Sequence, residues 1–344
     1  MGSRLRRYDE IMIFQPTALA LLLASSLNAL MLLTSGVFAL HLLRYWNPAS
    51  GSERQIALER RTYLVSTLVG LSLLIGLPAL ALFVHNADAM APFFTGAMCA
   101  VGSLKVNAWG MPALLTMLAG FFLAAAWLVL NHLDNRGWDT PLMRGKYRLL
   151  LLLAPLALAQ AVLLWLYYLN LNPEVITSCC GSLFGPAAEG VAADLAILPL
   201  EFIQPMFFGG WLLTLAVGAM FILRGRFGPN LGRSFGLLAG LHLPLALAAV
   251  IAFIAPYIYE QPNHHCPFCL LQAEHGYAGW VLYLPLFFGT ATGIGAGLAA
   301  ATRADSLREA APQVAVRLAK LSVAALGLFG LAVLFYLQRS NLVM

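Results

Sequence analysis

Long apolar runs, separated by short polar segments, dominate the chain. Eight of these runs are long enough to cross a bilayer, because a membrane helix needs about 20 mostly apolar residues. Backbone polar groups exposed to lipid must bond within their own segment, so every span is predicted to be helical. The predicted spans are residues 17–43, 63–84, 110–131, 148–170, 196–223, 234–256, 277–300 and 315–337. The pattern therefore predicts an all-α, polytopic membrane helical bundle, organised as a single integral membrane domain of residues 1–344.

Prolines and small residues within these runs indicate how the spans pack. A proline inside a membrane helix kinks it and leaves a carbonyl for neighbouring groups to satisfy. Gly289, Gly293 and Gly297 share one helical face, and small residues on one face allow helices to approach closely. The kinks are expected at Pro78, Pro155, Pro199, Pro205, Pro244 and Pro285. We therefore expect a compact bundle.

The charged residues agree with a membrane protein. They make up 10% of the chain, whereas soluble domains carry about 25%. The net charge is +5, but the basic residues are dispersed between apolar runs. That distribution is typical of membrane-protein loops, and we expect no nucleic-acid partner.

The basic residues also predict an orientation. Fifteen of the twenty lie in the loops 44–62, 131–148, 224–233 and 301–320, whereas the alternate loops 85–109, 171–195 and 257–276 contain only Lys105. Cytoplasmic loops carry the excess of Lys and Arg, so the first set is predicted to be cytoplasmic. Both termini are then outside. Arg4, Arg6 and Arg7 would lie outside against this rule, but the total bias outweighs them, and residues 3–14 are expected to form an interfacial helix. The expected location is a bacterial inner membrane.

This orientation places every cysteine on the extracytoplasmic side, on three cysteine-bearing outer loops. The five cysteines are Cys99, Cys179, Cys180, Cys266 and Cys269. Cysteines that serve only as small packing residues would be scattered through the spans. Their confinement to one oxidising face favours thiol or metal chemistry there.

The densest group of reactive side chains is His264-His265-Cys266-Pro267-Phe268-Cys269-Leu270-Leu271-Gln272. Pro267 suits the first turn of a helix, and a helix starting there would place Cys266 near the positive N-terminal end, which lowers the pKa of a thiol. Reversible disulfide exchange, a soft-metal site and a permanent structural disulfide are all compatible with this spacing. The flanking His264 and His265 would transfer protons or ligate a metal ion.

The segment from Cys266 to Gln272 resembles the Cys-x-x-Cys-Leu-x-Gln-Arg segment of the DsbB disulfide oxidases. Its predicted position, at the outer start of a helix, is similar to that of the Cys-x-x-Cys motif in vitamin K epoxide reductases. The resemblance covers fewer than ten residues, and Ala273 stands where the DsbB pattern has arginine. It implies a helical bundle that passes electrons between partner thiols and a membrane quinone, with Cys266 and Cys269 as the quinone-proximal pair. Gln272 and His275 are the candidate quinone-binding residues.

The other cysteines allow several arrangements. Cys179 and Cys180 are adjacent, and such a pair can close a strained disulfide or bind a soft ion. In a thiol-exchange scheme they form the second pair, between a partner and the Cys266–Cys269 pair. Cys99 is either the odd thiol or part of a relay with Cys179 and Cys180.

We predict a membrane thiol:disulfide oxidoreductase. Its catalytic residues are Cys266, Cys269, Cys179, Cys180 and His265, its cofactor is a quinone, and its partner is an extracytoplasmic thioredoxin-like protein or a small thiol. One alternative is a transporter or handler of copper, mercury or zinc, with a metal site drawn from His264, His265, Cys266, Cys269 and the acidic Glu201. A buried charge in a span is costly, so Glu201 is expected to mark a path or a hydrogen bond. A second alternative is a non-catalytic membrane subunit of a respiratory complex.

Overall fold

The structure is a computed structural model that describes residues 15–48, 50–174, 199–225 and 228–342, and these residues form helices and turns without any strand. Eight of their helical segments are long and apolar enough to cross a membrane. The prediction of an all-α, polytopic membrane bundle is therefore confirmed. The helices fall into two compact units, each described separately below, and the single membrane domain stays a prediction.

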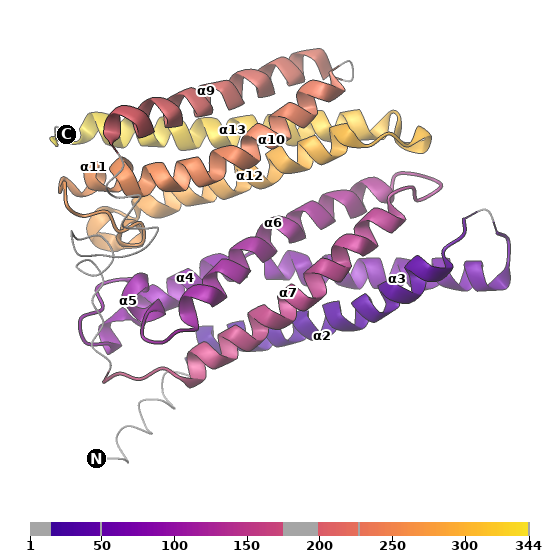
Figure 1. Cartoon of the computed structure of the whole chain (residues 1–344), viewed down its shortest axis with the longest axis horizontal. Helices are drawn as coiled ribbons and strands as arrows, with labels where there is room; N and C mark the ends of the chain where they lie inside the picture. Colours follow the sequence, from indigo (N-terminus) through magenta and orange to yellow (C-terminus); the bar gives the residue numbers. More distant parts are fainter. Residues whose placement is uncertain (1–14, 49, 175–198, 226–227, 343–344) are drawn as a thin grey trace. The chain divides into compact units, whose positions relative to one another are not determined.

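The first unit comprises most of the N-terminal half of the chain, in indigo to magenta in Figure 1. Its long helix α2 packs along α7, which also packs against α6. Pro78 interrupts the second predicted span, because proline has no N–H to continue the helical hydrogen bonds. The helices of this unit are α2 (Pro16–Tyr45), α3 (Glu53–Gly76), α4 (Ala79–Ala89), α6 (Gly110–Asp134) and α7 (Met143–Leu169).

A buried ion pair fixes the connection between α6 and α7. Lys146 Nζ lies 2.7 Å from Asp134 Oδ2, and both side chains are buried. Lys146 also donates to Asn131 Oδ1 at 3.1 Å, while the Leu142 N–H donates to Asp134 Oδ1 at 2.8 Å. The predicted loop 131–148 includes Lys146, but in the structure this residue lies inside α7, where these partners compensate for the loss of water.

The second unit contains the C-terminal helices and the short segment Gly96–Gly102. The sixth of the chain's eight spans lies in this unit and is a continuous run of α10, a π-helical turn and α11. The elements, from red to yellow in Figure 1, are α9 (Leu200–Arg224), α10 (Pro229–Ala249), the π turn η3 (Val250–Ile254), α11 (Ala255–Tyr259), the 3-10 turns η4 (Cys269–Leu271) and η5 (Ala273–His275), α12 (Ala278–Ala301) and α13 (Ala310–Arg339).

Small residues bring the helices of the second unit together, as the glycine spacing predicted. A Cβ added at Gly236 of α10 would lie 2.6 Å from the Cα of Gly297 in α12. On the neighbouring face of α12, a Cβ at Gly289 would lie 2.9 Å from Leu326 of α13. Helix α12 therefore packs closely against both neighbours.

Candidate three-cysteine site

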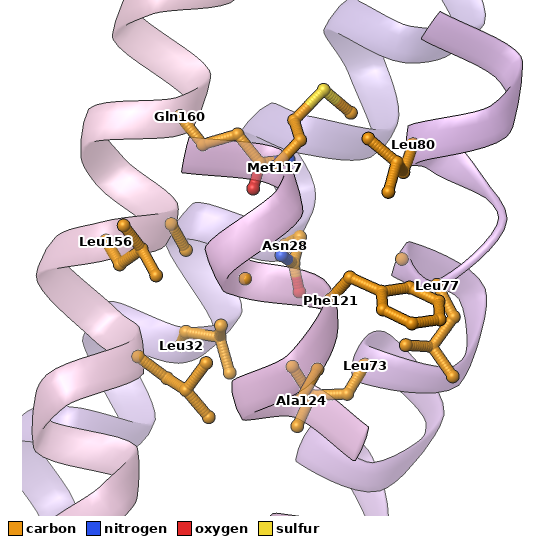
Figure 2. Close-up of a pocket in the computed structure, with 14 residues that line it drawn as sticks. Asn28, Leu32, Leu73, Leu77, Leu80, Met117, Phe121, Ala124, Leu156 and Gln160 are labelled. Carbon is orange, nitrogen blue, oxygen red and sulfur yellow. The ribbon is translucent and has the colours of Figure 1, made fainter. Parts of the chain in front are cut away.

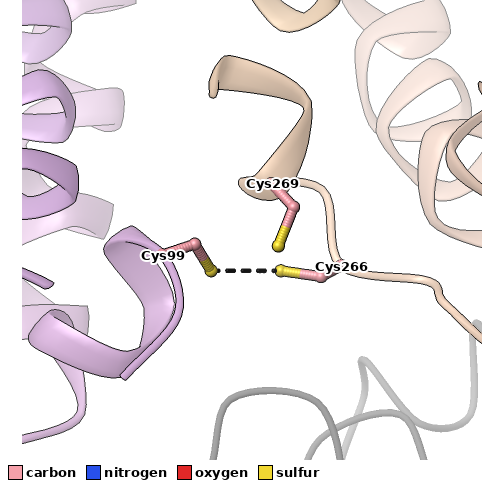
Figure 3. Close-up of side chains that lie close together, drawn as sticks. All are labelled: Cys99, Cys266 and Cys269. Carbon is pink, nitrogen blue, oxygen red and sulfur yellow. Dashed lines mark hydrogen bonds between the residues drawn. The ribbon is translucent and has the colours of Figure 1, made fainter. Parts of the chain in front are cut away.

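Three cysteines meet in the second unit, and Figure 3 shows their side chains pointing toward one another. Cys99, immediately before the short helix α5 (Ala100–Leu104), has its Sγ 3.6 Å from the Sγ of Cys266. The sulfurs of Cys99, Cys266 and Cys269 all lie within 4.8 Å of one another. All three are free thiols with exposed fractions of 0%, 0% and 3%. Every cysteine in the part of the chain that the structure describes thus belongs to one buried group.

The local structure of the Cys266–Cys269 segment differs from the prediction. No α-helix begins at Pro267: a tight turn leads into the 3-10 turn η4, and α12 begins only at Ala278. The turn ends because Gln272 adopts an extended conformation, with φ −86° and ψ 159°. The predicted influence of a helix N-terminus on Cys266 is therefore wrong.

Hydrogen bonds at its sulfur hold the pKa of Cys266 well below its usual range. The largest cause is the hydrogen bond with the Cys269 thiol, and the next is the hydrogen bond with the Cys99 thiol. Backbone hydrogen bonds at Phe268 and Cys269 act in the same direction, while burial opposes them. Because the thiolate is the nucleophile and the metal ligand, the lowered pKa favours reactivity at the sulfur of Cys266.

Two tyrosines fix the backbone of the cysteine turn. Tyr259 of α11 donates its hydroxyl to the carbonyl of Cys266 at 2.5 Å, and Tyr283 of α12 donates to the carbonyl of Pro267 at 2.6 Å. Gly279 allows the turn to approach α12, since a Cβ there would lie 2.8 Å from the side chain of Leu271. Neither tyrosine's role could be predicted from the sequence, because both residues are embedded in apolar runs.

Gln272 connects the two segments that carry the cysteines. Its Nε2 donates to the carbonyl of Met98 at 2.7 Å, directly beside Cys99. The sequence assigned Gln272 to quinone binding. In the structure this side chain holds the Cys99 segment against the Cys266–Cys269 turn.

The histidines surround the turn. His265 Nδ1 lies 2.8 Å from the carbonyl of Ile251 in the π turn, and because a carbonyl oxygen only accepts, Nδ1 donates this hydrogen bond. The ring of Tyr259 lies between His264 and His275, with centroid distances of 4.3 Å to each. Burial, followed by the proximity of His264, lowers the pKa of His275. Among the described residues, the group of potential metal ligands contains the three sulfurs and no histidine nitrogen.

The remaining predicted site residues lie apart from this group or outside the described residues. Glu201 is exposed in the first turn of α9, where the helix dipole favours an acidic side chain, and it is not a member of the sulfur group. Cys179 and Cys180 lie outside the described residues. Cys99 lies beside Cys266, and its predicted relay with Cys179 and Cys180 stays a prediction.

The first unit contains a separate cavity of about 40 Å³, shown in Figure 2. Its lining is apolar except for Asn28 and Gln160, and Asn28 Oδ1 accepts a hydrogen bond from Ser72 at 2.6 Å. No thiol, imidazole or carboxylate is among the lining residues of this cavity.

The fold and this group of residues define a polytopic integral membrane protein with a buried three-thiol site. Comparisons with protein-family models, curated proteins and solved structures found no match to the chain.

Proposed function

We propose that the protein is a membrane thiol:disulfide oxidoreductase that exchanges electrons between extracytoplasmic thiols and a membrane quinone. The observation that carries this proposal is the 3.6 Å separation of the Cys99 and Cys266 sulfurs, with Cys269 in the same buried group. Exchange proceeds when a thiolate attacks a sulfur of a neighbouring disulfide. With three sulfurs in contact range, a disulfide between two of them always has a third thiol within reach.

The exchange begins with the Cys266 thiolate. It attacks one sulfur of a disulfide between Cys179 and Cys180, a mixed disulfide forms, and the departing sulfur takes up a proton. Cys269 then loses its proton and attacks the sulfur of Cys266, which releases the second thiol and leaves a Cys266–Cys269 disulfide. A quinol restores both thiols by donating two electrons and two protons, and a quinone drives the same steps in reverse.

The burial of the three sulfurs supports a scheme in which another pair of cysteines contacts the partner. Cys266 and Cys269 are 0% and 3% exposed, so a folded partner protein does not reach them directly. In the proposal, Cys179 and Cys180 exchange with a thioredoxin-like protein or a small thiol, and Cys266 and Cys269 exchange with the quinone. The Nε2 of His265 accepts the proton released at this site. Gln272 and His275 are the proposed quinone-binding residues.

The test is thiol trapping of the purified full-length protein in lipid nanodiscs. A short-chain quinone added to the reduced protein should convert Cys266 and Cys269 to a disulfide, measured as loss of alkylated thiols by mass spectrometry. Cys266→Ser should abolish this conversion. A Cys179→Ser/Cys180→Ser variant is the matched control, since it should keep the quinone step and lose exchange with a thioredoxin-like protein. If the redox state of Cys266 and Cys269 responds to neither the quinone nor the partner, the proposal is wrong.

A further inference from the structure

We propose that the reduced sulfurs of Cys99, Cys266 and Cys269 form a three-coordinate binding site for a soft monovalent metal ion, Cu(I). This inference concerns a ligand that the redox proposal does not require. It rests on the arrangement of the three sulfurs and on the structure that holds them.

The sulfur separations suit a metal ion at their centre. A metal–sulfur bond of about 2.3 Å in a trigonal plane places the sulfurs about 4.0 Å apart. The Cys99–Cys266 separation is 3.6 Å and no pair exceeds 4.8 Å, so small side-chain rotations bring all three to that distance. The side chains converge on one point from two segments of the chain, as Figure 3 shows.

The composition of the ligand set selects the ion. Thiolates favour soft ions such as Cu(I), whereas structural Zn(II) sites are almost always four-coordinate. The described residues provide three sulfurs, with no histidine nitrogen or carboxylate oxygen in the same group. The Nδ1 of His265 is hydrogen-bonded to the carbonyl of Ile251, so this nitrogen is not a free ligand. A three-sulfur set with no fourth donor among those residues favours Cu(I) over Zn(II).

The surroundings resemble those of a pre-formed ligand site. Outer-shell hydrogen bonds that orient metal ligands are a general feature of such sites. Tyr259 and Tyr283 hold the carbonyls of the turn, and Gln272 holds the carbonyl of Met98 next to Cys99. Each ligand segment is thus fixed by at least one side-chain hydrogen bond from elsewhere in the second unit. The three sulfurs are also buried, which protects a bound Cu(I) ion from water and oxidants.

The experiment uses the reduced full-length protein in detergent without oxygen, in a Cys179→Ser/Cys180→Ser background. Cu(I) is titrated in competition with a chromogenic Cu(I) chelator. The expected result is one Cu(I) withdrawn per chain, with an X-ray absorption signal of three sulfur ligands at about 2.3 Å. The absorption measurement needs no ligand variant, so the proposal stays testable if a variant fails to fold.

Variants then identify the ligands. Cys99→Ser should weaken Cu(I) binding by more than about tenfold and leave two sulfur ligands, because removing even an outer-shell partner costs about 10- to 100-fold in affinity. Met98→Leu removes the exposed thioether beside Cys99 and is the matched control, with unchanged affinity expected. Unchanged affinity in Cys99→Ser, loss of affinity in His265→Gln, or displacement of Cu(I) by equimolar Zn(II) would each overturn the assignment.

The two proposals fail separately. A protein that binds Cu(I) through three sulfurs but shows no change of thiol state with quinone or partner contradicts the oxidoreductase function alone. A protein that exchanges disulfides and leaves all Cu(I) with the chelator contradicts the metal site alone.

Discussion

The Sγ atoms of Cys99 and Cys266 lie 3.6 Å apart although 167 residues separate them in the chain. This contact joins the segment Gly96–Gly102 to the turn between α11 and α12, and it makes Cys99 a third partner of the Cys266–Cys269 pair. Both sulfurs are fully buried. At this separation the two sulfurs can form a disulfide after a small movement, because the bonded sulfurs of a disulfide are about 2.05 Å apart.

We therefore predict that Cys99 and Cys266 form a disulfide when Cys269 is removed. In a Cys269→Ser variant that also lacks Cys179 and Cys180, a mild membrane-permeant oxidant should cross-link these two cysteines within the chain. The sulfurs need to move only by about 1.5 Å, which side-chain rotation supplies. Mass spectrometry of the unreduced peptides measures the product. The same variant with Cys99→Ser should show no intramolecular cross-link, and a predominance of cross-links between two chains would contradict the geometry.

The lowered pKa of Cys266 predicts how its reactivity changes with pH. An ordinary cysteine, with a pKa of about 8.5, loses thiolate about tenfold for each pH unit below that value. Because its pKa is lowered, the alkylation rate of Cys266 should fall less steeply between about pH 8 and about pH 7 than that of an ordinary cysteine. Cys269→Ala removes the largest cause of the lowered pKa and should make the decline steeper than in the wild type.

The measurement is the rate of iodoacetamide modification of Cys266, followed by peptide mass spectrometry. Burial slows the reaction at every pH, so the ratio of rates at two pH values is the informative quantity. A wild-type rate that falls about tenfold over this interval would show an ordinary pKa.

Much of the fold was predictable because it depends on a local property, the length of each apolar run. All eight predicted spans correspond to helical segments, and the glycine spacing in α12 predicted its close contacts. The break at Pro78 also follows from the chemistry of proline, which the sequence displays directly.

The site was less predictable because its contacts are not local. The sequence marked Cys266, Cys269 and Gln272 by their spacing, but nothing in it connects Gln272 to Met98 or Cys99 to Cys266. The helix expected at Pro267 failed for a local reason, since Gln272 adopts an extended conformation and α12 starts after two positive φ angles at Gly276 and Tyr277. Pro267 by itself predicted the start of an α-helix, but the residues that follow it do not form one.

Gln272 should act as a positioning residue for Cys99. Gln272→Ala removes the hydrogen bond to the carbonyl of Met98, and one such bond contributes about 1 kcal/mol. The population in which Cys99 lies against Cys266 should fall by roughly fivefold. The measure is the rate of Cys99–Cys266 cross-linking in the Cys269→Ser background.

Gln261→Ala is the control for this prediction, because Gln261 is an exposed glutamine of the same connection between α11 and α12. Its substitution should leave the cross-linking rate unchanged. Equal rates in the Gln272→Ala variant and its parent would show that the Cys99 segment is held by packing alone.

The contact between α10 and α12 predicts which glycines the second unit requires. Gly236→Ala places a Cβ 2.6 Å from the Cα of Gly297, and this backbone atom cannot move aside by a side-chain rotation. The helices must separate, so we expect a loss of about 1–3 kcal/mol in stability, which is typical of overpacking.

Gly209→Ala in α9 is the matched control, since no atom lies within 4 Å of the added Cβ. Alanine is favoured over glycine in a helix by up to about 1 kcal/mol, so the control should melt at the same or a higher temperature. Thermal unfolding in detergent, followed by the exposure of the buried cysteines to a thiol-reactive dye, measures both variants. Equal melting temperatures for Gly236→Ala and the parent would mean that α10 and α12 do not approach as closely as these two glycines indicate.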